Sequence, residues 1–191
     1  KSIGGFGNAN GKLRSPHGLA LDANDNLYVV DPGNFRISVF DKNGNFIRKW
    51  GSKGSGPGQF QGDMRGIAIN KTAGWVYVVD GEGNKVSKFD LFGTFINKWG
   101  GAGHGDGEFA DGGREATVDN DGNLWVADMP NYRVQKFGPS GAFLSSYPNP
   151  PQPPPTGGFN APRGVAVNPV DGAIAVSDTY NWRIQTFKPT G

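Results

Sequence analysis

The sequence predicts an all-β protein built from four copies of one sheet unit, and three observations support this. Each copy has an apolar run ending in an aspartate, and the aspartates lie 49, 48 and 50 residues apart, at Asp31, Asp80, Asp128 and Asp178. Five residues after each aspartate comes a cation that opens a second strand-like run: Arg36, Lys85, Arg133 and Arg183. Only strand signals occur inside the copies. Self-similarity at a period of roughly 40 to 50 residues is then typical of a β-propeller.

The composition agrees with short strands joined by tight turns. The chain has 32 Gly and 14 Pro among 191 residues, and most of them lie between the strand-like runs. The formal charge of +2 is too small to imply a nucleic-acid partner. The chain has no cysteine, which excludes a disulfide framework and any thiolate site. No apolar run approaches the roughly 18 to 20 residues of a membrane span.

Four strands are expected in each copy. In the first copy they cover residues 18–22, 27–30, 36–40 and 46–50, separated by turns at 23–26, 31–34 and 41–45. The last turn contains Asn43-Gly44, a dipeptide that favours hairpins because it readily takes positive φ. A glycine-rich connection at 51–58 then leads to the next copy.

The other copies follow the same order. Their first strands are expected at 67–70, 116–119 and 164–167, and the outer strand of the third copy at 143–147. The whole chain, 1–191, is therefore predicted to be one domain, with repeats at approximately 13–60, 61–109, 110–158 and 159–191, the last joined by 1–12. In the fourth copy the chain stops at the turn before an outer strand.

The first residues hold the complement of that strand. Ile3 precedes Leu13 by ten residues, just as Trp50 precedes Phe60 and Trp99 precedes Phe109. We therefore expect residues 1–5 to complete the fourth blade, either in the same chain or in a neighbouring one. The second arrangement would give a homo-oligomeric ring or a filament through exchange of the terminal strand.

The repeat resembles a known family. Pro16-His17-Gly18-Leu19-Ala20-Leu21-Asp22 is followed by Asn26-Leu27-Tyr28-Val29-Val30-Asp31 and then by Arg36-Ile37-Ser38-Val39-Phe40, a pattern similar to the NHL repeat. All four copies carry this pattern. The resemblance implies a propeller that serves as a binding platform for proteins or RNA, as a sensor domain, or occasionally as a lyase. Members usually have six blades, whereas this chain has four repeats. Three arrangements are therefore open: a closed four-bladed ring, a fragment of a larger ring, or one part of an assembly.

One set of residues precedes the first strand of each copy in the same register: His17, Arg65, Arg114 and Arg163. Innermost strands line the channel of a propeller, so these side chains are predicted to form a cationic ring at one mouth. Such a ring would suit a carboxylate, phosphate or sulfate, because guanidinium groups bind planar anions in bidentate fashion. The alternative is that each arginine folds back and pairs with an acid or a carbonyl of its own blade.

Two further sets recur. The aspartate and cation pairs are interpreted as structural, because they occur in every copy and loop acids commonly cap turns. The position before the cation holds Phe35, Tyr132 and Trp182, with Asn84 in the second copy. These aromatics could stack on sugars or bases, or could pack between blades.

The sequence gives little support for catalysis. Peptidyl-hydroxyglycine lyases resemble this family and hold zinc with several histidines. This chain has only two histidines, His17 and His104. A zinc site usually needs about three protein ligands. No metal, no cofactor and no enzymatic activity are therefore predicted, and a zinc-dependent lyase is kept as an alternative.

Two loop features bear on the environment. Residues 148–155 are rich in proline and should form an exposed polyproline II segment. Asn70-Lys71-Thr72 is a glycosylation sequon, which has meaning in a secreted protein. We therefore expect an extracellular or secreted, non-catalytic scaffold that binds a protein or glycan, and that could self-assemble as a structural protein. RNA binding is the second alternative.

Overall fold

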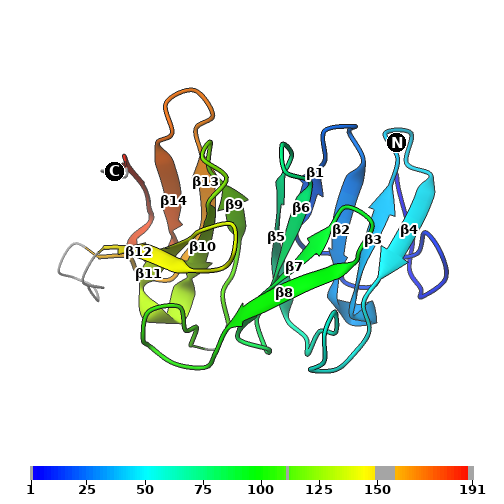
Figure 1. Ribbon diagram of the computed structural model, residues 1–191, viewed down its shortest axis with the longest axis horizontal. Helices are drawn as coiled ribbons and strands as arrows, with labels where there is room; N and C mark the ends of the chain where they lie inside the picture. The colour runs from blue at the N-terminus through cyan, green and yellow to red at the C-terminus, as the bar shows by residue number, and fades with distance from the viewer. Residues whose placement is uncertain (1, 111, 149–157, 189–191) are drawn as a thin grey trace.

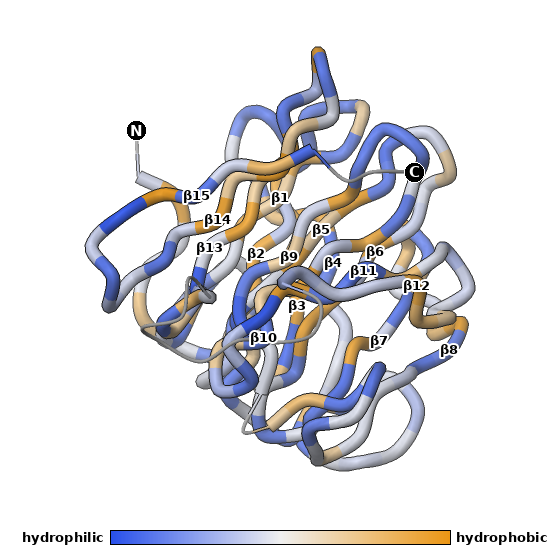
Figure 2. Tube along the Cα trace, turned by 90° about the vertical axis from the view of Figure 1, so that its left-hand side faces the viewer, coloured by the Kyte–Doolittle hydropathy of each residue, from blue (hydrophilic) through white to orange (hydrophobic). Residues whose placement is uncertain are grey.

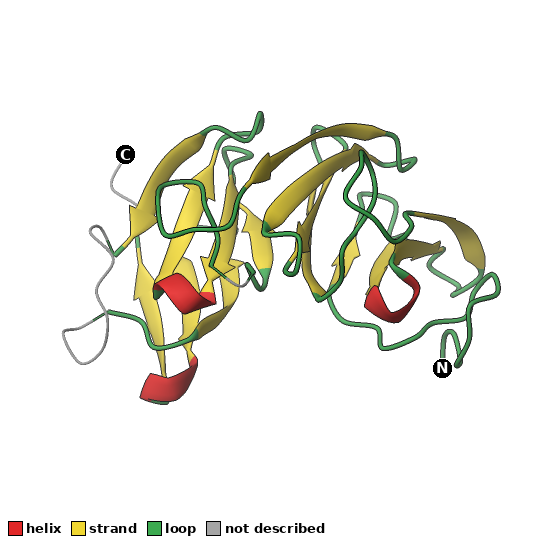
Figure 3. Cartoon of the chain, turned by 90° about the horizontal axis from the view of Figure 1, so that it is seen from below, coloured by secondary structure: helices red, strands yellow, loops and turns green. Residues whose placement is uncertain are grey.

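The computed structural model describes residues 2–110, 112–148 and 158–188. Within them the chain forms β-strands and three single-turn 3-10 helices, which confirms the predicted all-β class. The helices η1 (Pro32–Asn34), η2 (Met129–Asn131) and η3 (Thr179–Asn181) each join the second and third strands of a blade. Figure 3 shows these helices in red among the yellow strands.

The strands form four antiparallel sheets, each following chain order. Blade 1 contains β1 (Leu19–Leu21), β2 (Leu27–Asp31), β3 (Arg36–Phe40) and β4 (Phe46–Trp50). Blade 2 contains β5 (Met64–Asn70), β6 (Trp75–Asp80), β7 (Lys85–Asp90) and β8 (Phe95–Gly100). Blade 3 contains β9 (Ala116–Val118), β10 (Leu124–Asp128), β11 (Arg133–Phe137) and β12 (Phe143–Tyr147). Blade 4 contains β13 (Pro162–Val167), β14 (Ile174–Asp178) and β15 (Arg183–Phe187).

The four sheets are the blades of a β-propeller. Their inner strands lie side by side in chain order, β1 against β5, β5 against β9 and β9 against β13. Figure 1 shows blade 1, near the N-terminus, and blade 4, near the C-terminus, towards opposite ends of the longest axis of the molecule. Hydrophobic residues concentrate in the strands and hydrophilic ones in the connecting loops (Figure 2).

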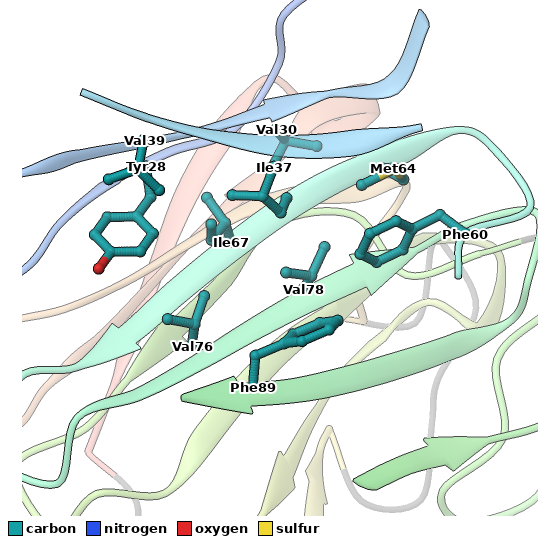
Figure 4. Packing of buried hydrophobic residues seen from close by; sticks show 10 residues of the cluster. All are labelled: Tyr28, Val30, Ile37, Val39, Phe60, Met64, Ile67, Val76, Val78 and Phe89. Carbon is teal, nitrogen blue, oxygen red and sulfur yellow. The ribbon is translucent and has the colours of Figure 1, made fainter. Parts of the chain in front are cut away.

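The core lies between blades, because each thin sheet is apolar on both faces. Between blades 1 and 2, Tyr28 and Ile37 pack on Val76, Val78 and Phe89, all fully buried (Figure 4). Equivalent clusters join blades 2 and 3 and blades 3 and 4. Burying one such side chain contributes about 1.5–3 kcal/mol, so each blade depends on its neighbours.

The N-terminal segment corrects one expectation. Asn34 Nδ2 donates to Gly7 O at 2.9 Å and Arg36 donates to Asn8 O at 2.7 Å, so the segment is held on blade 1. The bridge between Phe6 and Leu13 repeats in the connections before blades 2 and 3, where Lys53 pairs with Phe60 and Ala102 with Phe109. Residues 4–13 are thus the connection that precedes a blade, and no strand pairs with the outer edge of β15 in the described ranges. In the described part of the chain, the N-terminal segment therefore does not complete blade 4 of its own chain.

The proline-rich segment lies outside the described residues apart from Pro148. Among the described residues, no helix has the length and apolar character needed to cross a membrane.

Candidate anion-binding site

The four register-equivalent residues predicted to form a ring meet at one hollow. His17, Arg65, Arg114 and Arg163 line a cavity of about 260 Å³ together with Glu115. Each of the four comes from a different blade, at the start of or just before its inner strand. We call this hollow, with these five residues, the basic mouth.

Close approach of the inner strands creates the basic mouth. Gly18 N donates to Arg65 O at 3.0 Å, and Glu115 N donates to Arg163 O at 3.2 Å, so backbone hydrogen bonds link neighbouring blades. A Cβ atom on Gly18 would lie 2.2 Å from Arg65 O, and one on Gly66 would lie 2.4 Å from Arg114 O. Glycine at these two positions therefore allows the inner strands to converge.

Two of the three arginines are paired with an acid. Asp63 accepts from Arg65 at 2.6 Å and from Arg114 at 3.0 Å, and the second contact crosses from one blade to the next. Both pairs are partly exposed, so each contributes little to stability. The alternative of an arginine paired with an acid of its own blade therefore describes Arg65 alone, because Arg114 pairs with the same carboxylate from the neighbouring blade.

Arg163 has a different environment. Its guanidinium lies over the Tyr180 ring, 5.6 Å from the ring centroid, and one of its NH groups donates to the Tyr180 hydroxyl at 3.4 Å. The side chain is exposed, and within residues 2–110, 112–148 and 158–188 no carboxylate forms an ion pair with it. His17 is also exposed. These two residues form the accessible part of the basic mouth.

The charge of the basic mouth depends on Glu115. Burial raises the pKa of the Glu115 carboxyl, and the nearby Arg65 partly opposes this shift. Burial and the proximity of Arg65 lower the pKa of Arg114, while Asp63 works in the opposite direction. When Glu115 and the neighbouring Asp63 are both ionised, two carboxylates oppose the three guanidinium groups, so the net charge at the mouth stays positive. Protonation of Glu115 increases this positive charge.

The recurring aspartate and cation pairs lie away from this cavity, each between two adjacent strands of a single blade. The pairing distances are 2.9 Å for Asp31 and Arg36, 3.3 Å for Asp80 and Lys85, 2.9 Å for Asp128 and Arg133, and 2.7 Å for Asp178 and Arg183. The aspartates are fully buried. Arg36 also donates to the carbonyls of Asn8 and Lys12, and so ties the preceding connection to its blade.

The aromatic set is not gathered into one surface by contacts among the described residues. Phe35, Tyr132 and Trp182 each follow the 3-10 helix of their own blade, with φ of 52°, 56° and 53°. Phe35 lies under Lys53, whose Nζ is 5.2 Å from the ring centroid, whereas Trp182 is 92% exposed.

The remaining candidates lie elsewhere. His104 Nδ1 lies 2.5 Å from Asn131 Oδ1, outside the basic mouth, and no group of three His, Cys, Asp or Glu side chains suits a metal in the described part of the chain. His17 shares its cavity with three arginines and one glutamate, so these residues do not supply the roughly three ligands that a zinc site usually needs. Asn70 is 9% exposed and its Oδ1 accepts from Ala73 N at 2.9 Å, a poor position for a glycan.

Sequence reasoning did not single out Asp63 or Tyr180. Asp63 lies two residues before Arg65, at a position held by Ser15, Gly112 and Ala161 in the other copies. All four take positive φ, at 55°, 44°, 89° and 54° for Ser15, Asp63, Gly112 and Ala161. An acid two residues before an arginine was the available signal, but the turn that brings Asp63 to both arginines is not visible in the sequence.

Comparisons with known proteins agree with this architecture. A family model described as a 6-bladed beta-propeller matches residues 16–99, and the NHL repeat model matches residues 159–187. The chain is 38% identical over 69 residues to RING finger protein nhl-1 of Caenorhabditis elegans, covering 36% of this chain and 7% of that protein. It is 40% identical over 83 residues to peptidylglycine alpha-amidating monooxygenase of Rattus norvegicus, covering 39% and 8%.

Among solved structures, virginiamycin B lyase from Staphylococcus aureus superposes with a TM-score of 0.62 at 17% identity, covering 90% of this chain and 55% of the lyase. At that identity the likeness concerns the fold alone. The chain matches only 7–8% of the length of these two curated relatives, and about half of the lyase.

Proposed function

We propose that this chain, which matches the NHL repeat model over residues 159–187, is a non-catalytic binding module whose basic mouth receives a carboxylate of a protein partner. One observation carries the proposal. Four cationic or histidine side chains that recur at one register of the repeat come together at a single cavity.

The size and charge of the cavity favour a small anionic group. A hollow of about 260 Å³ is large enough for one carboxylate-bearing side chain or chain end. Arg163 and His17 are exposed at its edge. Tyr180 restrains Arg163 through the contact with its ring, which reduces the entropy lost when the guanidinium binds an anion.

The residue set supports binding over chemistry. The residues facing His17 across the cavity are mainly arginines, which repel a divalent metal, and a zinc-dependent lyase would need further metal ligands. Zinc analysis of the purified protein separates the two proposals, because stoichiometric zinc lost in His17→Ala would favour the lyase. An extracellular location, a glycan on Asn70 and service as a structural scaffold stay predictions.

Calorimetric titration with glutarate at low ionic strength tests the binding proposal. We expect millimolar binding that weakens about three- to tenfold in Arg163→Gln, because one charge-assisted contact is lost. Lys42→Gln removes the same charge from an exposed loop and should leave the affinity unchanged.

Two results would overturn this proposal. Equal glutarate affinity in the Arg163 and Lys42 variants would place the anion elsewhere. Tight binding of a single-stranded oligoribonucleotide with a steep dependence on salt, and none of glutarate, would instead indicate phosphate contacts of RNA.

A further inference from the structure

An acid that interrupts the repeat pattern lies beside the basic mouth. Asp63 occupies the turn before β5, in blade 2, which has a blade on each side. The residues at this position in the other blades are not acidic: Ser15, Gly112 and Ala161. The Asp63 carboxylate pairs with Arg65 of its own blade at 2.6 Å and with Arg114 of blade 3 at 3.0 Å. Two of the three arginines that line the cavity therefore share one anion that belongs to the protein.

The backbone holds Asp63 in this position. Its φ is 44°, in the left-handed region that aspartate tolerates better than most residues. Gly81 N donates to Asp63 O at 3.3 Å, so the turn before β5 lies against the turn after β6. A carboxylate fixed in this way pairs with both arginines without the loss of translational freedom that an external anion undergoes on binding. Free anions in solution therefore compete poorly with Asp63 for these two arginines.

Asp63 also changes the net charge that a ligand meets at the basic mouth. When ionised, Asp63 and Glu115 oppose the three guanidinium groups, so one positive charge remains if His17 is left aside. A ligand group with one negative charge neutralises this remainder. A group with two negative charges leaves an excess negative charge close to the two carboxylates, and like charges repel more strongly in a hollow of the protein than in bulk water.

We infer that Asp63 determines the charge selectivity of the basic mouth. It favours a group with a single negative charge, such as a carboxylate, over a compact group with two, such as a phosphate monoester. The inference rests on the proposed function, since it specifies which anions the same cavity receives. Asp63 acts through Arg65 and Arg114, whose charge it partly neutralises, and it does so without contacting the ligand.

Methanesulfonate and sulfate test the selectivity, because they are similar tetrahedral anions with one and two negative charges at neutral pH. Calorimetric titrations at constant ionic strength give the ratio of their affinities. In Asp63→Asn we expect methanesulfonate to bind about 1.5- to 3-fold more tightly, the gain expected when one partly screened charge is removed. Coulombic energy is proportional to the charge of the ligand, so the affinity for sulfate should increase by the square of that factor, about two- to ninefold.

Asp25→Asn is the matched control. Asp25 is an exposed acid that also has a positive φ, 61°, and it lies in the turn after β1, at the opposite end of this strand from His17. This variant removes the same charge and should leave the ratio of the two affinities unchanged. Asp63→Ser is a second variant, because Ser15 has a positive φ at the same position in blade 1. It should show the same change in selectivity as Asp63→Asn.

The possible results separate this inference from the proposed function. An equal gain for the two anions in Asp63→Asn and Asp63→Ser, or an equal change of the ratio in Asp25→Asn, would overturn the inference and leave anion binding in place. Binding of both anions that Arg163→Gln does not weaken would overturn the proposed function, and the inference with it.

Discussion

At the scale of single residues, the buried pair of an aspartate and a cation is the feature that recurs in every blade. Its environment differs along the chain. The Arg133 side chain is 2% exposed, whereas that of Arg183 is 46% exposed, although their distances to Asp128 and Asp178 are 2.9 and 2.7 Å. Both aspartates also accept hydrogen bonds from an asparagine and a glutamine of the same blade. The same ion pair therefore has a buried cation in blade 3 and a partly exposed cation in blade 4.

Arg133→Ala should lower the free energy of unfolding by about 3–5 kcal/mol, because removal of one partner leaves a buried carboxylate uncompensated. Arg183→Ala should cost about 1 kcal/mol or less, since water can replace the exposed guanidinium. Chemical denaturation of both variants at neutral pH provides the measurement. Equal losses of unfolding free energy in the two variants would show that burial of the cation does not control how much the pair contributes to stability.

The Arg133 variant also has a pH signature. Burial raises the pKa of Asp128 despite hydrogen bonds from Asn131 and Arg133, and loss of the arginine raises it further. An acid whose pKa is higher in the folded state takes up protons on folding. The loss of unfolding free energy that its ionisation causes is therefore absent below the unfolded pKa of about 4, and it grows as the pH rises through the pKa of the folded state. The deficit of Arg133→Ala should therefore be smaller at pH 4 than at pH 7.

At the scale of elements, the inner strands approach one another more closely than side chains would allow. Gly18 lies against the backbone of Arg65, and its N–H donates across the blade boundary. Gly101, in a connection, has nothing within 4 Å of an added Cβ. These two glycines therefore have different reasons to be glycine.

Gly18→Ala should lower the free energy of unfolding by about 1–3 kcal/mol, because a methyl group in this position forces β1 away from β5. Gly101→Ala should instead raise it by about 0.4–1 kcal/mol, through the reduced entropy of the unfolded chain. Thermal unfolding of the two variants distinguishes these effects. A neutral Gly18→Ala would mean that the strands can separate without loss.

At the scale of the whole molecule, sequence periodicity was sufficient to predict the blades. Strand order, turn positions and the meeting of His17, Arg65, Arg114 and Arg163 follow from one register repeated four times. The periodicity did not predict the course of residues 2–13. The match of Ile3 to Trp50 fixes a register along the chain, but it does not determine which sheet the segment joins. Asp63 was also missed, since only the positive-φ turn before β5 brings its carboxylate to arginines of two blades.

Every blade contributes a residue to the basic mouth, and one of these residues, Glu115, is an acid. The affinity of the mouth for anions should therefore depend on pH through Glu115. Sulfate is a suitable probe, since it stays a dianion from neutral pH to well below the pKa of a carboxyl group. Burial raises the pKa of Glu115, so protonation removes one negative charge from a cavity lined by three arginines, two of which pair with Asp63. Sulfate affinity should therefore increase as the pH falls through that pKa. His17→Asn serves as the background, because it removes the imidazole from the cavity.

In this background, Glu115→Gln should bind sulfate about two- to fivefold more tightly at pH 7, the change expected when one partly screened charge is neutralised. Its affinity should also vary less between pH 7 and pH 4 than that of the parent. Calorimetric titrations at constant ionic strength measure both quantities. The opposite order of affinities at pH 7 would mean that Glu115 does not face the bound anion, and an unchanged pH profile would assign the titration to another group.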